Sequence, residues 1–126
     1  MARIRRPRPV PLTTRLAEEA RRLPTELRDW WELGLRYWSL YQSNEIFLKA
    51  LTNSWRELTV DELLSLDEAQ LAAAEPLFET VERFRLWLTH TDVMPATLEG
   101  RLTALLDEIT PLAESAAREL YASPAG

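Results

Sequence analysis

The sequence predicts an all-α fold: an antiparallel helical bundle of three long helices plus one or two short ones, preceded by an extended basic N-terminal arm. Three observations support this fold class. Apolar residues recur at spacings of three and four along most of the 126 residues, which is the period of a helix with one buried face. No segment shows the strict alternation of a half-buried strand, and helix-capping sequences separate the apolar runs. A chain of this length is expected to form one domain around a single core.

The first eleven residues, MARIRRPRPVP, are predicted to form the basic arm. They include four arginines and no acidic residue, whereas the remaining chain carries 11 basic against 20 acidic side chains. Alternating prolines fix φ and remove backbone donors, so this segment cannot form a regular helix and is expected to be extended. We therefore divide the chain into a flexible Arg/Pro-rich arm over 1–11, a helical bundle domain over 12–121 and a frayed tail over 122–126.

Three roles are open for the arm. Its arginines can contact the phosphates of a nucleic acid or enter a narrow A·T minor groove. As a polyproline segment, the arm can instead dock into an aromatic-lined groove of a protein partner. In the third role it is a solvated terminus, held against the acidic body of its own chain. The residues expected to make nucleic-acid or phosphate contacts are Arg3, Arg5, Arg6 and Arg8.

The first helical pattern is short and is followed by a long one. Thr13 or Thr14 is expected to cap a short helix, which we expect Pro24 to end because proline cannot donate a helical hydrogen bond. Thr25 then caps a helix that is expected to run mainly unbroken over 26–55. Gly34 and the pair Ser43-Asn44 are the points where this helix can bend or break.

The second half of the chain predicts two long helices and one short turn. Thr59–Glu62 reads as a capping box that opens a single helical turn, and Ser65–Glu68 as a second box that opens a long helix. The last helix begins near Thr97. Pro76 and Pro111 lie inside these two long patterns and are expected to bend them. The last helix has a narrow seam of coiled-coil type, formed by Leu98, Leu102, Leu105, Ile109, Leu112 and Ala116.

An aromatic band lies between Trp30 and Trp55. It contains four of the five tryptophans, two of the three tyrosines and Phe47. Aromatic side chains at this density form the core of a small bundle, or a face that another molecule covers. We expect most of them to be core, and the surplus beyond one helix face to form a homodimer contact. The residues predicted for this interaction face are Trp31, Leu35, Trp38 and Phe47.

Carboxylate pairs give a third and weaker hypothesis, a magnesium-dependent nucleotide hydrolase. Asp29 and Glu32 are three residues apart, as are Glu79 and Glu82. The E-x-x-E element at 79–82 resembles the acidic clusters of all-α nucleotide pyrophosphatases, but the E-x-x-D element of that family does not follow. Arginines lie four residues after Glu32 and after Glu79, so ordinary surface ion pairs explain these residues as well.

The remaining composition favours a binding protein over an enzyme. The chain has no cysteine and a single histidine, His90, which is expected to cap the end of the long helix before it. We predict no catalytic residues, no metal and no cofactor. No apolar run approaches the roughly 18 residues of a membrane span, so we expect no membrane contact and a cytoplasmic protein. The predicted function is that of a small regulatory or assembly subunit that self-associates or binds a protein partner, with nucleic-acid binding through the arm as the alternative.

Overall fold

The structure, a computed structural model, describes residues 10–121. These residues are all helical or irregular and contain no strand, so the all-α prediction is confirmed for this part of the chain. The elements in chain order are α1 (Leu12–Asp29), α2 (Trp31–Tyr41), α3 (Glu45–Ala50), the 3₁₀ turn η1 (Trp55–Glu57), α4 (Val60–Leu64), α5 (Glu68–Thr89) and α6 (Leu98–Tyr121).

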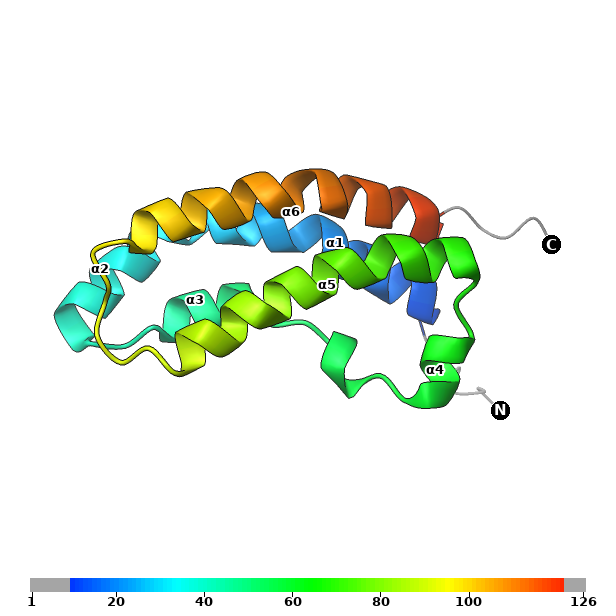
Figure 1. Cartoon of the computed structure of the whole chain (residues 1–126), viewed down its shortest axis with the longest axis horizontal. Helices are drawn as coiled ribbons and strands as arrows, with labels where there is room; N and C mark the ends of the chain where they lie inside the picture. The colour runs from blue at the N-terminus through cyan, green and yellow to red at the C-terminus, as the bar shows by residue number, and fades with distance from the viewer. Residues whose placement is uncertain (1–9, 122–126) are drawn as a thin grey trace, which may run out of the picture.

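The three long helices α1, α5 and α6 form the body of the molecule (Figure 1). Helix α6 lies against both α1 and α5 and runs antiparallel to each, whereas α1 and α5 run in the same direction. Antiparallel packing therefore applies to the two pairs that include α6. Helices α2 and α3 form a hairpin at the end of the bundle where α6 begins. The segment 51–66 then returns to the start of α5, and Trp55 within it stacks on Phe78 with 5.1 Å between ring centroids.

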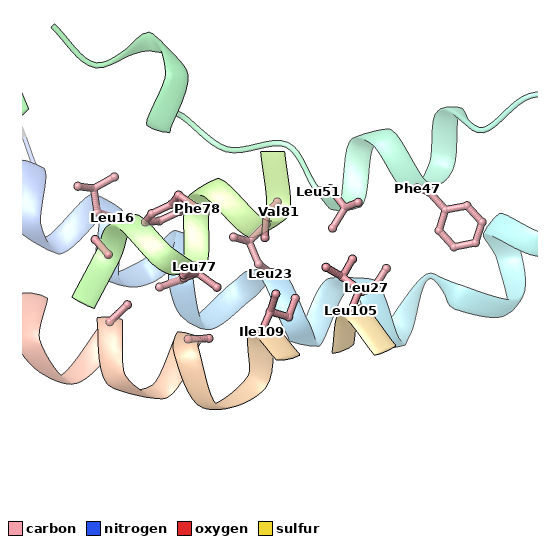
Figure 2. Close-up of a cluster of buried hydrophobic side chains, with 14 of the residues drawn as sticks. Leu16, Leu23, Leu27, Phe47, Leu51, Leu77, Phe78, Val81, Leu105 and Ile109 are labelled. Carbon is pink, nitrogen blue, oxygen red and sulfur yellow. The ribbon is translucent and has the colours of Figure 1, made fainter. Parts of the chain in front are cut away.

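The hydrophobic core is continuous along the three long helices and reaches α3 (Figure 2). Leu23 and Leu27 of α1 meet Val81 of α5 and Ile109 of α6, and all four are fully buried. The predicted seam of α6 is inside as expected: its members are buried, apart from Leu112, which is partly buried against the core. Burial of this apolar surface supplies the main stabilisation of the fold.

The boundaries of the first helices differ from the prediction. Pro24 does not end a helix but lies buried inside α1, which begins after Pro11 and continues to Asp29. Thr13, Thr14 and Thr25 therefore lie inside α1, and none of them caps a helix as predicted. A proline inside a helix loses one backbone bond, and burial of the surrounding apolar face outweighs that loss here. The expected long helix over 26–55 is instead divided at Trp30 and again at Gln42, whose φ of 53° places it in the left-handed region. The interruption covers residues 42–44 and so includes the predicted Ser43-Asn44 pair, whereas Gly34 lies inside α2. The last part of the expected helix, α3, ends at Ala50 and not at residue 55.

The caps of α4 and α5 show one confirmed prediction and one correction. Thr59 and Glu62 form both hydrogen bonds of a capping box at the start of α4. The second box uses Asp67 and Gln70, because the Asp67 side chain accepts the Gln70 N–H at 2.8 Å and the Gln70 side chain accepts the Asp67 N–H at 3.0 Å. Asp67 therefore caps α5, and the prediction that Ser65 does so is wrong.

The end of α5 is held by Asn44, which the sequence pattern marked only as a point where the chain can bend or break. His90 is at the C-cap as predicted, but the side chain that donates to the carbonyls here is the amide of Asn44. Its Nδ2 donates to the carbonyl oxygens of Leu88 and Thr91. Asn44 directly follows the turn between α2 and α3, so these bonds attach the α2–α3 hairpin to α5.

Candidate interaction surface

The aromatic band is divided between two faces of α2. On the inner face, Gly34 and Trp38 are buried, and Trp38 makes an edge-on contact with Phe47 of α3 at 6.3 Å between ring centroids. Gly34 is required at this crossing because a Cβ there would lie 2.6 Å from Cζ of Phe47. The glycine thus lets the Phe47 ring lie directly on the backbone of α2, and α3 packs closely against α2 as a result.

All four residues predicted for the interaction face contact the core. Trp38 is 1% exposed and Phe47 is fully buried, while Trp31 and Leu35 are partly buried and packed against the core. The structure places this set on the inner side of the α2–α3 hairpin. Trp38 and Phe47 are therefore closed to a partner in this conformation, whereas Trp31 and Leu35 keep part of their surface accessible.

The outer face of α2 carries the residues that remain accessible. Trp30 is 40% exposed, Leu33 51%, Leu40 67% and Tyr41 66%. Tyr37, partly buried, lies among them and packs on Tyr41 with 4.7 Å between ring centroids. At 100° per residue these positions fall within an arc of about 100° on the helix, so they form one continuous strip along it. We call these five residues the outer stripe.

The outer stripe follows from the local sequence. Glu32, Arg36 and Ser39 fall within an arc of about 60° on α2, and the rest of the circumference is almost entirely apolar. One part of the apolar surface packs on α3 and the core, and the other part meets solvent. The spacing of the stripe is visible in the sequence, but Trp31 and Trp38 show an equally regular spacing. The contact between Gly34 and Phe47 decides which side faces inward.

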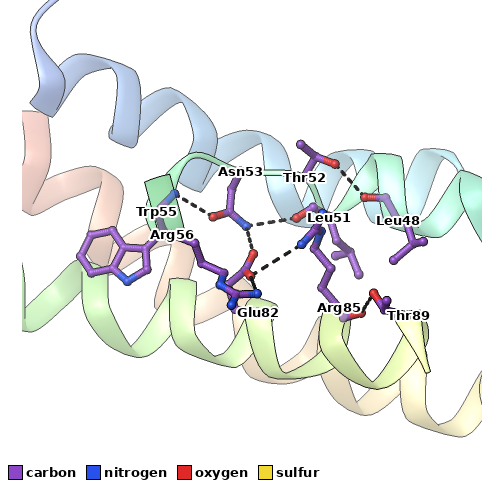
Figure 3. Close-up of polar contacts among 9 residues, drawn as sticks. All are labelled: Leu48, Leu51, Thr52, Asn53, Trp55, Arg56, Glu82, Arg85 and Thr89. Carbon is purple, nitrogen blue, oxygen red and sulfur yellow. Dashed lines mark hydrogen bonds and ion pairs between the residues drawn. The ribbon is translucent and has the colours of Figure 1, made fainter. Parts of the chain in front are cut away.

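A polar cluster around Glu82 attaches the segment 51–57 to α5 (Figure 3). Asn53 donates to Oε1 of Glu82 at 3.0 Å and accepts the backbone N–H of Trp55 at 3.0 Å. Arg56 and Arg85 approach Oε2 of Glu82 to 3.5 Å and 3.8 Å. The Glu82 side chain is 13% exposed, and its contacts fix the loop that covers Phe78. This cluster has a structural role.

The structure separates the carboxylates of the hydrolase hypothesis. Glu82 faces the loop 51–57, whereas Glu79 is exposed on the side of α5 that faces α6. Asp29 and Glu32 are exposed and belong to different helices, α1 and α2. Among residues 10–121, no three acidic or histidine side chains gather in a group that could hold a metal ion. The hydrolase remains a hypothesis from the sequence.

The predicted contacts of the arm, at Arg3, Arg5, Arg6 and Arg8, lie outside the described residues and stay a prediction. Within residues 10–121, no helix is long and apolar enough to cross a membrane. No protein-family model, curated protein or solved structure matches the chain.

Proposed function

We propose that this chain is a non-enzymatic helical-bundle protein, a small regulatory or assembly subunit, that self-associates through the outer stripe of α2. One observation carries the proposal. Five large apolar side chains lie on one face of an 11-residue helix and its cap, and four of them are 40% to 67% exposed. Isolated exposed leucines are ordinary on protein surfaces, but a continuous strip with three aromatic rings is typical of a protein contact.

The size of the stripe sets the strength of the expected contact. A whole aromatic side chain buries roughly 150–250 Å², so the exposed parts of the stripe amount to on the order of 400 Å². Two copies in contact hide on the order of 800 Å², which is below the roughly 1,200–2,000 Å² of a stable complex. We therefore expect a weak dimer that forms and dissociates with concentration.

A second copy is a suitable partner because the stripe is complementary to itself. In a two-fold contact each surface meets an identical surface, so a charged stripe would place like charges together. The outer stripe has no charged residue, and its exposed polar atoms are the hydroxyls and the indole N–H at the tips of its aromatic rings. Tyr and Trp in such positions are favoured at interfaces, since the ring can be buried while its polar tip stays near water.

The test is the dissociation constant of the dimer, measured by sedimentation equilibrium. Leu33→Gln/Leu40→Gln keeps good helix formers and removes the two exposed leucines of the stripe. Each leucine contributes about 1 kcal/mol to the free energy of dimerisation, because full burial of a leucine is worth roughly 2 kcal/mol and about half of each side chain is exposed in the monomer. The two-fold dimer contains four such leucines, so the double variant loses about 4 kcal/mol of dimerisation free energy. Its dissociation constant should be about 1,000-fold higher than that of the parent.

A matched control changes two exposed leucines elsewhere. Leu64 on α4 is 76% exposed and Leu86 on α5 is 51% exposed. Leu64→Gln/Leu86→Gln is expected to leave the dissociation constant within threefold of that of the parent. Circular dichroism confirms that both double variants stay folded. A parent chain that remains monomeric at every concentration, or a control variant as impaired as the stripe variant, contradicts the proposal.

A further inference from the structure

A groove runs between α5 and α6, away from the outer stripe. Its two sections have volumes of about 560 Å³ and 360 Å³ and share Thr80, Arg83 and Glu108, so they form one continuous depression. Apolar groups line it along its length: the rings of Pro76 and Pro111 and the side chain of Leu112 in the first section, and Phe84 and Trp87 in the second. We call it the α5–α6 groove.

The first section of the groove is acidic. Glu75, Glu79 and Glu108 line it and are exposed, against the single basic side chain of Arg83. The ion pairs among residues 10–121 involve none of these four residues, so the i, i+4 pair expected between Glu79 and Arg83 is not formed. Three carboxylates are thus available for a positively charged ligand.

Pro76 adds a backbone acceptor to the same section. A proline inside a helix has no N–H to donate to the carbonyl four residues before it. Pro76 therefore leaves the carbonyl of Ala72 without its usual helical donor. Ala72 lines the groove together with both prolines. The section is rich in hydrogen-bond acceptors, which suits the five N–H donors of a guanidinium group.

Aromatic groups continue the groove beyond the acidic section. Phe84 and Trp87 pack together with 5.3 Å between ring centroids, and Arg101 of α6 lies over the Trp87 ring at 4.7 Å. Aromatic-lined grooves are the usual docking sites for proline-rich segments in polyproline conformation. Acidic and aromatic groups in one groove therefore match a ligand that contains both arginine and proline.

We propose that the chain's own N-terminal segment, residues 3–9, docks in the α5–α6 groove. The segment RIRRPRP carries four arginines, two prolines and no acidic residue, so its charge complements the acidic first section of the groove. Arginine–carboxylate contacts hold it in the first section, and its prolines lie against the apolar lining.

The segment leads into α1 at the end of the bundle where α5 starts. Arg15 pairs with Glu62 at 3.5 Å, so the start of α1 lies beside α4, which leads into α5. Figure 1 shows the starts of α1 and α5 at the same end of the bundle. Along the axis of α5, Glu75 and Glu79 lie about 10 Å and 17 Å from the first residue of the helix, at a rise of 1.5 Å per residue. From Val10 back to Arg3, a polyproline segment covers about 22 Å.

Paramagnetic labelling of the full chain tests the proposal. The chain has no cysteine, so Ala2→Cys carries a nitroxide label at one known position. In the docked state the label selectively broadens the amide resonances of groove residues, reducing their intensity by half or more. Resonances of α2 keep their intensity. At 1 M salt, where the Debye length is about 3 Å, the broadening is lost.

Two variants and one mixture decide the outcome. Glu75→Gln/Glu79→Gln/Glu108→Gln removes the three groove charges and should abolish the broadening. The matched control, Glu32→Gln/Glu57→Gln/Glu114→Gln, changes three exposed carboxylates outside the groove and should preserve it. Absence of broadening in the parent, or equal broadening in both variants, overturns the proposal. Broadening in an isotope-labelled chain mixed with a separate spin-labelled chain overturns docking within one chain.

Discussion

Replacing Gly34 by alanine sets helix propensity against packing, and the structure predicts which effect is larger. In the interior of an exposed helix, glycine is about 1 kcal/mol less favourable than alanine. On that ground alone Gly34→Ala stabilises α2. The Cβ of the alanine, however, would lie 2.6, 2.8 and 2.9 Å from three atoms of the Phe47 ring. Contacts this short force either the ring or the helix to move.

The Phe47 ring has little freedom to move. It is fully buried and packs edge-on against Trp38, which is itself 1% exposed. Overpacking a well-filled core costs about 1–3 kcal/mol, and this contact belongs at the upper end because three ring atoms are involved. We therefore expect Gly34→Ala to lower the free energy of unfolding by about 2 kcal/mol, after the gain in propensity is included.

Urea denaturation followed by circular dichroism measures this change. Gly100→Ala is the control, because no atom lies within 4 Å of the added Cβ there. It should raise the free energy of unfolding, by up to about 1 kcal/mol. In a double-mutant cycle, Phe47→Leu should relieve part of the cost of Gly34→Ala, since the two changes share one contact. A Gly34→Ala variant more stable than the parent would refute the packing argument.

Three further substitutions test the turn and cap residues. Gln42→Gly should stabilise the fold by about 1 kcal/mol in thermal denaturation, because φ of 53° is unfavourable for a residue with a Cβ. A variant no more stable than the parent would contradict this expectation. Asn44→Ala should destabilise the fold by about 1–2 kcal/mol and increase hydrogen exchange of α2 and α3, since both side-chain bonds to α5 are lost. The backbone N–H of Thr59 lowers the pKa of Glu62 below its ordinary value of 4.5, helped by Arg15. The stability from this shift is present above about pH 4.5 and is lost as the pH falls through the lowered pKa, so Glu62→Gln should lose less stability than the parent on acidification. Equal acid sensitivity would argue against this role of Glu62.

The fold class and the two C-terminal helices were predictable from the sequence because their patterns are local. The seam from Leu98 to Ala116 repeats every three or four residues, and Thr59 and Glu62 satisfy each other within one turn. The boundaries around Pro24 and Trp30 were not predictable in this way. Burial of α1 on the core, which the sequence pattern does not reveal, decides that the helix continues through Pro24.

The faces of α2 illustrate the same limit. Apolar residues cover most of this helix, so periodicity alone allows several inner faces. The choice depends on a contact between residues 34 and 47, which form part of different helices. The hydrogen bonds from Asn44 to the end of α5 join residues more than 40 positions apart in the sequence, and the Glu82 cluster likewise joins distant segments. Contacts of this kind follow from the tertiary packing and have no local signature.

Self-association through the outer stripe is the central claim, and hydroxyl-radical footprinting tests it most directly. Radicals modify accessible aromatic side chains, so the full chain is compared at a dilute and at a concentrated condition with equal radical dose. We predict that Trp30 and Tyr41 become protected at high concentration, while Tyr121, 45% exposed at the end of α6, reacts equally in both. Unchanged reactivity of Trp30 and Tyr41 while the mass of the particle doubles would place the contact elsewhere and contradict the account.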